Sequence, residues 1–499
     1  MIWIFLSSGL FLGWSLGAND AANIFGTAIG TKMLRFRTAA IFGSIFVILG
    51  AVISGSGAAH TLGKLGDINA VGGAFTVALA AGATVSWMAK LGLPVSTTQA
   101  IVGSIVGWDL FTGSQIDTVS LTKIVSTWFF SPLLAGIFAF ILFNILKFYL
   151  KRVKIHLLQI DNFTRIGLLL IGIFGAYSLG ANNIANVMGV FMGSNPFKGL
   201  SLGFFYLNDI QVLFMVGGFA IALGIFTYSY KVITTVGREL HKLSPLAALV
   251  VVLAESLVLF IFASQSLERF LVSMGIPPLP LVPVSSSQAV VGAIVGIGIA
   301  RGGGRAINFK KLYKIVVGWF LTPLSSGILS FILLFFMQNV FQISTYKPIK
   351  YSITEYTYRD VPSTLRQAIE PIKGEVFANA REFKEKLSEL GIKKEDTGYL
   401  LSLARIDSIY IDSMIAKREL DQKWFGKKRI EAVKKLHGRM FVHKWQVVEE
   451  LSKISDEWKF RSSDRRYRVY NRELKKMYDT IFHVFSIQNI REKFKISPE

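Results

Sequence analysis

The chain has 499 residues, of which 52% are hydrophobic, and it contains 40 Phe and 45 Gly. This composition is typical of membrane proteins. The net charge of +22 would suggest nucleic-acid binding in a soluble protein, but many Lys and Arg lie in short connections between apolar segments, where membrane topology accounts for them. We therefore expect no nucleic-acid partner, and the absence of cysteine excludes disulfides, thiolate metal sites and cysteine nucleophiles.

Eight apolar windows are long enough to cross a bilayer as helices, the form in which backbone polar groups pair with one another. They cover residues 2–30, 38–57, 70–90, 120–147, 164–190, 210–229, 245–264 and 313–340. Two shorter stretches, 94–108 and 283–300, begin with proline and are rich in Gly and Ser. These features predict half-helices or re-entrant hairpins.

Four connections carry an excess of Lys or Arg, which places them in the cytoplasm by the positive-inside rule. They are Thr31–Arg37, Lys147–His156, Lys231–Lys242 and Arg301–Lys314. The amino terminus is then predicted to lie outside. If the 94–108 stretch crosses the membrane fully, the first half makes an odd number of crossings and the second half enters upside down. That is the topology of inverted repeats.

Two polar motifs occur twice, in the same order, within these apolar surroundings. Residues 17–26 (GANDAANIFG) return as 180–189 (GANNIANVMG), and residues 94–103 (PVSTTQAIVG) return as 283–292 (PVSSSQAVVG). Trp128 and Pro132 are weakly echoed by Trp319 and Pro323. Duplication of an ancestral half explains this order. We predict a first transmembrane repeat at 1–156 and a second at 157–342.

The repeated motifs have the chemistry of a binding site, because unpaired polar groups in a bilayer need partners, water or a ligand. Asn19 and Asn23 share one helix face with Asp20 between them, and carboxylate, amide and carbonyl oxygens suit a hard cation. Nearby glycines allow close helix packing or local unwinding. The second motif places hydroxyls and an amide at a helix start, which presents N–H groups to an anion. Neither motif contains Lys or Arg, so the anion would depend on co-bound cations for neutralisation.

One more intramembrane carboxylate, Glu255, lies in the 245–264 window and is a candidate coupling acid. We could align no acidic counterpart to it in the first half. The chain shows no nucleophile, base and orienting group in one constellation, so we expect no enzymatic activity.

The remaining residues, 343–499, alternate charged and apolar positions like a soluble helical domain, with apolar spacing typical of helices at Leu400–Ile415 and Val442–Leu451. They resemble helical-bundle domains of phosphate-uptake regulators, which implies a regulatory or assembly role; the alternative is a passive accessory domain. The excess of Lys and Arg favours the cytoplasmic side, whereas the span count places this domain outside. The expected fold is thus all-α: a polytopic membrane protein with inverted repeats and broken or re-entrant helices, followed by a soluble helical domain.

At the duplicated motifs the sequence resembles the inorganic phosphate transporter family, whose bacterial and animal members are sodium- or proton-coupled phosphate symporters. The likeness covers residues 1–340. It implies phosphate as substrate and phosphate or sodium ligands at the motif positions. These positions are Asn19, Asp20, Asn23, Ser96, Thr97, Thr98, Gln99, Asn182, Asn183, Asn186, Ser285, Ser286, Ser287 and Gln288. Among them, sodium is assigned to Asp20, Asn23, Asn186, Ser96 and Ser285.

The second copy departs from the family pattern, which usually has aspartate in both copies, because it carries Asn183. One negative charge near a cation site is lost, and the number of coupled ions stays open. The resemblance predicts a multi-pass transporter of the cell membrane, assembled as a homodimer, that imports phosphate with sodium by alternating access. It needs no cofactor beyond the coupling ions. The alternatives are a proton-coupled phosphate or sulfate symporter, an anion channel and a membrane receptor.

Overall fold

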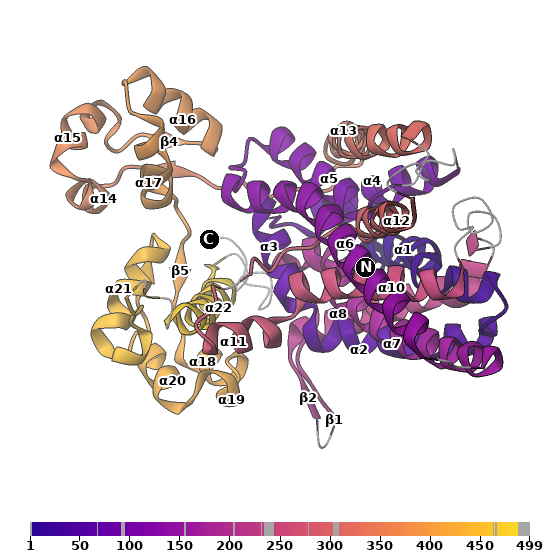
Figure 1. Ribbon diagram of the computed structural model, residues 1–499. Helices are drawn as coiled ribbons and strands as arrows, with labels where there is room; N and C mark the ends of the chain where they lie inside the picture. Colours follow the sequence, from indigo (N-terminus) through magenta and orange to yellow (C-terminus); the bar gives the residue numbers. More distant parts are fainter. Residues whose placement is uncertain are drawn as a thin grey trace. The chain divides into compact units, whose positions relative to one another are not determined.

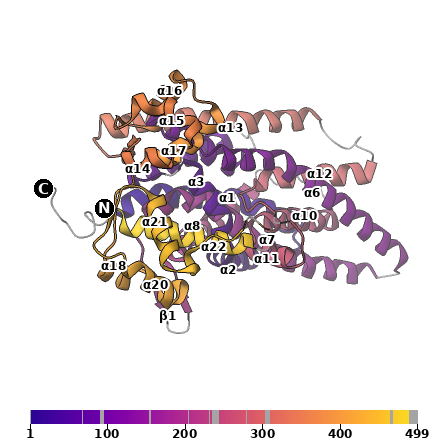
Figure 2. The ribbon, with the colours of Figure 1, turned by 90° about the vertical axis from the view of Figure 1, so that its left-hand side faces the viewer.

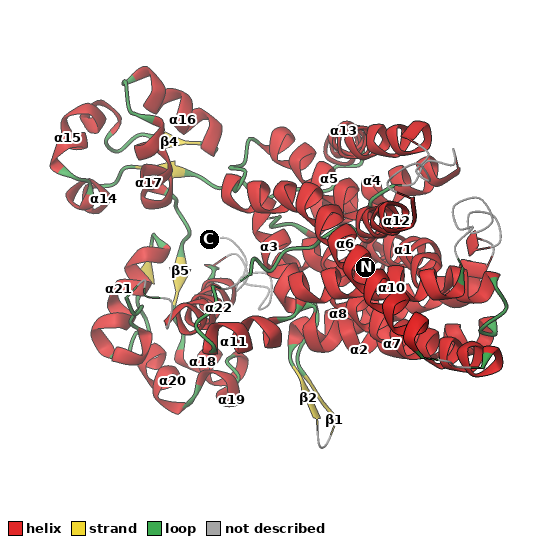
Figure 3. Ribbon diagram, viewed as in Figure 1, coloured by secondary structure: helices red, strands yellow, loops and turns green. Residues whose placement is uncertain are grey.

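The computed structural model describes residues 2–66, 68–90, 95–153, 156–202, 205–230, 232–233, 244–277, 279–302, 309–462, 464 and 467–487. Within these ranges the chain is mainly helical, and the paired strands form three short two-stranded sheets (Figure 3). The chain divides into two compact units, the first holding most residues up to Lys347 and the second those from Pro348 on. The predicted all-α class is confirmed.

The first unit contains both sequence repeats. Its first half comprises α1 (Ile2–Gly30), α2 (Phe36–Ser54), α3 (Ser56–Gly66), α4 (Val71–Lys90), α5 (Thr97–Thr112) and α6 (Thr118–Arg152). Its second half comprises α7 (Leu157–Met188), η1 (Gly189–Ser194), β1 (Leu200–Leu202), β2 (Phe205–Leu207), α8 (Asp209–Thr227), α10 (Pro245–Ala263), α11 (Gln265–Ser273), α12 (Ser286–Gly302) and α13 (Phe309–Asn339). Figure 2 shows many of the long helices running roughly along one direction.

Eight described helices, namely α1, α2, α4, α6, α7, α8, α10 and α13, are long and apolar enough to cross a membrane. They coincide with the eight windows predicted from the sequence. The two shorter stretches also form helices, α5 and α12. Pro94 lies outside the described residues, and extended chain from Val282 to Ser285 precedes α12.

Helices of each half pack mainly against helices of the other half, so the two halves are not separate bodies. Helix α1 packs on α8, and its counterpart α7 packs on α2; α5 packs on α13, and its counterpart α12 packs on α6 (Figure 1). Each contact therefore has a symmetry-related twin, as expected for duplicated halves related by a pseudo-twofold axis.

Glycines bring these helix pairs to backbone contact. A Cβ on Gly103 would lie 2.1 Å from the carbonyl oxygen of Pro323, and a Cβ on Gly292 would lie 2.0 Å from that of Pro132. Small residues allow such close approach of helices in membranes. The weak repeat of Pro132 and Pro323 seen in the sequence thus marks two equivalent contact points.

The first glycine of each asparagine-rich motif has the same use. A Cβ on Gly17 would lie 2.0 Å from the carbonyl oxygen of Ile221, and one on Gly180 would lie 2.0 Å from that of Val47. Helices α1 and α7 run through their motifs without a break. Of the two uses expected of these glycines, the structure shows close packing at Gly17 and Gly180 and no unwinding. A Cβ on Gly26 would meet only Ala22 of the same helix, and a Cβ on Gly30 would meet no atom within 4 Å.

We predict that Gly103→Ala lowers stability by about 1–3 kcal/mol or more, because the new methyl group must displace the backbone of α13. The measurement is the melting temperature and the monodisperse yield in detergent. Gly302→Ala is the matched control, because no atom lies within 4 Å of a Cβ at Gly302. Equal stability of the two variants would contradict the role of Gly103 in packing.

The directions of the helices show that the repeats are inverted. Helices α2 and α7 run parallel, since Val47 contacts Gly180 and Gly55, further along α2, contacts Ile184, further along α7. Because α2 follows α1 after a short turn, α1 and α2 are antiparallel, and α7 opposes its counterpart α1. Helices α6 and α12 are parallel in the same way. The inverted-repeat prediction is therefore confirmed.

Inversion requires an odd number of crossings in the first half, a condition that is met if α5 crosses in addition to α1, α2, α4 and α6. The equivalent crossing in the second half would be α12. The eight candidate spans with α5 and α12 would then make ten crossings, which would return the chain after α13 to the side of the amino terminus. All four basic connections then lie on the opposite side, as the positive-inside rule requires of the cytoplasm.

We therefore predict that the second unit lies outside the cytoplasm, despite its excess of Lys and Arg. The chain has no cysteine, so a single Met414→Cys replacement, at a side chain that is 80% exposed, gives a clean reporter. We expect a membrane-impermeant maleimide to label it in intact cells. The control, Lys151→Cys in a basic connection, should react only after permeabilisation. The reverse labelling pattern would place the second unit in the cytoplasm.

The second unit consists of two modules with a similar order of elements, visible as two helical clusters in Figure 1. The first module contains β3 (Tyr351–Ser352), α14 (Glu355–Asp360), α15 (Ser363–Ile369), η2 (Glu370–Ile372), β4 (Val376–Phe377), α16 (Ala380–Glu389) and α17 (Lys394–Ala404). The second contains β5 (Ile409–Tyr410), α18 (Ser413–Glu419), α19 (Gln422–Phe425), α20 (Lys427–Lys434), β6 (Met440–Phe441), α21 (Lys444–Ile454), η3 (Asp456–Trp458) and α22 (Arg468–Phe485).

The repeat extends to single residues. In each module a glycine at positive φ, Gly374 or Gly438, donates its N–H to the residue after the first strand, Ile353 or Ile411, at 2.9 Å in both cases. This duplication was not predicted from the sequence. The expected helix over Leu400–Ile415 was wrong, because α17 ends at Ala404 and β5 follows; α21 covers most of Val442–Leu451.

Candidate functional site

The four copies of the repeated motifs lie together inside the first unit. The asparagine-rich motifs lie within α1 and α7, and the hydroxyl-rich motifs form the first turns of α5 and α12. All the motif residues predicted as ligands are buried except Asn19, Asn23 and Ser287, which are half-buried. The sequence repeat thus corresponds to one cluster in space.

Serine residues cap both short helices. The Ser96 hydroxyl accepts the backbone N–H of Gln99 at 3.3 Å, and the Ser285 hydroxyl accepts that of Gln288 at 3.2 Å. In each case the serine is the N-cap and the glutamine is the third helical residue. The first backbone N–H groups of a helix have no intrahelical acceptor, so each helix start can donate hydrogen bonds to an anion.

These two helix starts meet each other. The Thr98 hydroxyl on α5 donates to the backbone carbonyl of Val284 at 3.3 Å, and the Ser287 hydroxyl on α12 donates to that of Val95 at 3.0 Å. Because the helices come from opposite repeats, the positive ends of two helix dipoles converge on one region. Val95 and Val284 were missed in the sequence, although both directly follow the repeated prolines.

Each asparagine-rich motif contacts the hydroxyl-rich motif of the other half. On α7, Asn186 donates to the Thr98 hydroxyl of α5 at 2.9 Å. On α1, Asp20 accepts the Ser286 hydroxyl of α12 at 2.9 Å, and Asn23 donates to the same hydroxyl at 3.5 Å. The site is therefore completed only when both repeats are present.

Asp20 and Asn183, which occupy equivalent positions of the two motifs, contact each other directly. The Asn183 amide donates to the Asp20 carboxylate at 2.9 Å. Glu255 on α10 is fully buried and close enough to interact electrostatically with Asp20. Two acidic side chains are thus associated with this region.

Several oxygens here have no hydrogen-bond donor among the described residues. They are Oε1 of Gln99, Oε1 of Gln288, Oδ1 of Asn186 and both carboxylate oxygens of Glu255. A buried acceptor without a donor is costly, and amide and carboxylate oxygens are the ligands that hard cations prefer. This oxygen set is the feature that fits cation binding.

Two of the predicted residues make fewer contacts with the cluster. Asn19 donates to the backbone carbonyl of Ser15 on its own helix at 2.9 Å. Thr97 is buried at the first position of α5. The assignment of individual residues to phosphate or to sodium stays a prediction.

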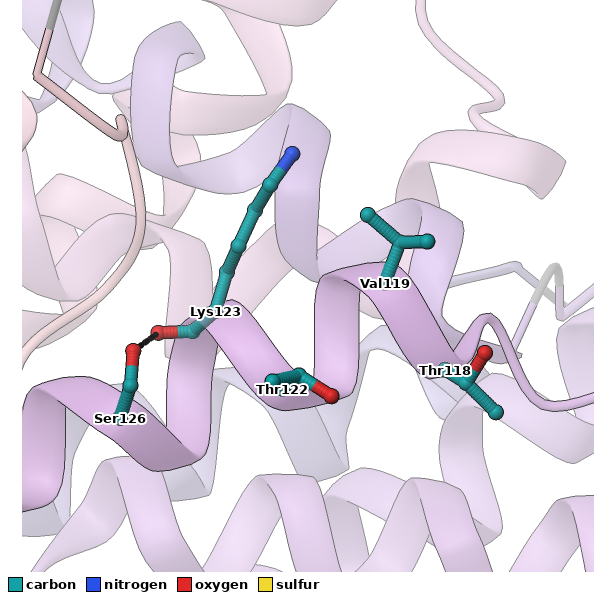
Figure 4. Close-up of a pocket in the computed structure, with 5 residues that line it drawn as sticks. All are labelled: Thr118, Val119, Thr122, Lys123 and Ser126. Atoms are coloured by element: carbon teal, nitrogen blue, oxygen red, sulfur yellow. Dashed lines mark hydrogen bonds between the residues drawn. The ribbon is translucent and has the colours of Figure 1, made fainter.

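A separate surface pocket is lined by Thr118, Val119, Thr122, Lys123 and Ser126 of α6 (Figure 4). Its residues belong to one helix, include none of the repeated motifs, and present one lysine. The described residues also contain no group of three or more His, Asp or Glu side chains placed to hold a metal ion. Neither feature competes with the motif cluster as the functional site.

Comparison with known proteins identifies the family to which this architecture corresponds. The sequence model of the phosphate transporter family matches residues 16–165, 151–274 and 280–486. The chain belongs to the phosphate transporter family. Membership of this family, together with the eight candidate spans, makes it a multi-pass membrane protein and points to transport rather than enzymatic catalysis.

Relatives within the phosphate transporter family are distant but similar over nearly their whole length. A protein of Pyrococcus furiosus assigned as a phosphate permease is 25% identical, over 64% of this chain and 92% of its own. One of Haemophilus influenzae with the same assignment is 25% identical, over 68% and 97%. The solved structure of a sodium-dependent phosphate transporter shares the fold, with a TM-score of 0.54 and 22% identity over 68% of this chain and 98% of that chain.

Proposed function

We propose that this protein is a secondary active symporter that imports inorganic phosphate together with sodium ions by alternating access. The observation that carries the proposal is the crossed arrangement of the motifs. Two helix starts with neutral hydroxyl donors suit an anion, and they adjoin carboxylate and amide oxygens that suit cations.

Charge explains why the two solutes would travel together. None of the described Lys or Arg side chains of the chain is buried, so no fixed cation is available inside to neutralise phosphate. Asp20 and Glu255 instead place two ionisable carboxyl groups near the site. Co-bound cations would satisfy both the carboxylates and the anion, and each solute then raises the affinity for the other.

Sodium is the coupling ion we propose because the solved structure with the same fold is that of a sodium-dependent phosphate transporter. The oxygen ligands available for a cation support a monovalent hard cation, since they are amide oxygens with few carboxylates. A proton is the second candidate, favoured by the fully buried carboxyl group of Glu255.

The deciding experiment measures uptake of radiolabelled phosphate into proteoliposomes that contain the purified protein, at fixed pH and clamped voltage. We expect an inward sodium gradient to drive accumulation above equilibrium, and an equal potassium gradient to drive none. Accumulation driven by a pH gradient alone would favour proton coupling. Competition by sulfate tests whether phosphate is the preferred substrate. Phosphate flux that depends on neither the sodium nor the pH gradient would indicate a channel. Phosphate binding without flux would indicate a receptor.

A further inference from the structure

Asn182 forms two hydrogen bonds to the backbone of the segment that leads into α12. Its side-chain amide donates to the carbonyl oxygen of Val284 at 2.7 Å and accepts the N–H of Val284 at 2.9 Å. A third bond, donated to the Asn183 side-chain oxygen at 2.7 Å, uses the remaining amide hydrogen. Because Asn182 is fully buried and its amide is engaged at both ends, it holds this segment rather than presenting free groups to a ligand.

The equivalent hydrogen bonds, from asparagine to valine, are not formed among the described residues of the first repeat. Asn19 is the counterpart of Asn182, and Val95 is the counterpart of Val284, by their positions in the two repeated motifs. Asn19 is half-buried and its amide donates to Ser15 on its own helix at 2.9 Å. The described contacts of Asn19 and Val95 include no bond between the two residues.

The contacts between the two helix starts obey the repeat. The bonds from Thr98 to Val284 and from Ser287 to Val95 are equivalent, and so are the two serine caps. The pair Asn19 and Val95 departs from symmetry although these neighbouring contacts keep it. The asparagine-rich motifs depart as well, because Asn186 donates to Thr98 whereas its counterpart Asn23 donates to Ser286 and not to the counterpart of Thr98. Differences between equivalent positions are what two positions of a switch would produce.

We infer that Asn182 and Asn19 are alternating clamps, each closing on the valine of its own repeat in one of the two membrane orientations of the transporter. The inference rests on the proposed function, because inverted repeats exchange their conformations when access alternates. In the structure Asn182 is closed on Val284. In the oppositely facing form Asn19 closes on Val95 and Asn182 releases Val284, so the two helix starts are held in turn. Both asparagines act as positioning residues.

Cysteine pairs test this directly, since the chain has no native cysteine. The variants are Asn182→Cys/Val284→Cys and Asn19→Cys/Val95→Cys, oxidised in membranes or bridged by a short bis-thiosulfonate reagent, because a disulfide forms only between closely placed residues. Ser104→Cys/Ser326→Cys, at hydroxyls 2.6 Å apart between α5 and α13, is the control that measures complete oxidation.

We expect both clamp pairs to cross-link, and sodium with phosphate to change their yields in opposite directions by at least about twofold. The inference is overturned if the Asn19/Val95 pair fails to react while the control and the Asn182/Val284 pair do, or if both yields move together. Hydrogen exchange at single-amide resolution on the unmodified protein is the second measurement. There, ligands should protect the N–H of one valine and expose that of the other.

These readouts are separate from the proposed function. If the two cross-links alternate but phosphate uptake does not depend on sodium, the clamp inference is supported and sodium coupling is rejected. Sodium-driven uptake with only one clamp pair ever forming would keep symport and reject the clamps.

Discussion

Asp20→Asn is expected to lower sodium-driven phosphate uptake by about 100-fold or more. Asp20 is buried and accepts hydrogen bonds from Asn183 and Ser286, each at 2.9 Å. The substitution removes the carboxylate that would pair with a bound sodium ion. Losing one member of a buried ion pair costs about 3–5 kcal/mol, and each 1.4 kcal/mol is about tenfold in binding. The measurement is initial uptake in proteoliposomes as a function of sodium concentration, with size-exclusion profiles to confirm folding.

The inverted repeat supplies a matched control for this variant. In Asp20→Asn/Asn183→Asp the carboxylate moves to the equivalent position of the other repeat, and the pair keeps one acid and one amide in contact. We expect this double variant to recover a large part of the sodium-dependent flux. Undiminished sodium dependence in the single variant would remove Asp20 from the cation site.

Glu255→Gln is expected to weaken the coupling between cation and phosphate by about 5- to 150-fold, which corresponds to about 1–3 kcal/mol. The side chain of Glu255 is fully buried, has no hydrogen-bond donor among the described residues, and interacts with Asp20. Glutamine keeps the shape and removes the ionisable carboxyl group. The apparent phosphate affinity at several sodium concentrations and several pH values measures the change.

Ser256→Ala is the control for local disturbance of α10, because the Ser256 hydroxyl only donates to Val252 on the same helix at 2.6 Å. Loss of sodium dependence in Glu255→Gln would make Glu255 a cation ligand. Loss of pH dependence alone would make it a proton carrier and favour the proton-coupled alternative. If the sodium dependence and the pH dependence both match the wild type, Glu255 has a structural role only.

The sequence predicted much of the membrane unit because the bilayer imposes simple rules. The eight long spans follow from apolar length, and the inversion follows from the order of the repeated motifs and the basic connections. The course of α5 and α12 was harder to predict, because Gly, Ser and Thr lower the hydropathy of these two helices. Their polar residues face other helices and not lipid.

Single-residue roles at the site depend on packing that no motif encodes. Ser96 and Ser285 were predicted as sodium ligands from the family resemblance, and in the structure their hydroxyls also cap α5 and α12. Asn19 and Asn182 look alike in the sequence, yet only Asn182 holds its valine. The tandem modules of the second unit were missed because their similarity lies in turns and caps, and very few identical residues mark it.

The exchange of helix partners between the repeats has a consequence for biosynthesis. The first repeat leaves the ribosome with the faces of α1, α2, α5 and α6 still uncovered, because their partners α8, α7, α13 and α12 are translated later. Lipid or an insertion factor must shield the glycine-lined faces during that interval. A split gene encoding the repeats as two polypeptides should therefore yield a stable protein only when both halves are made in the same membrane.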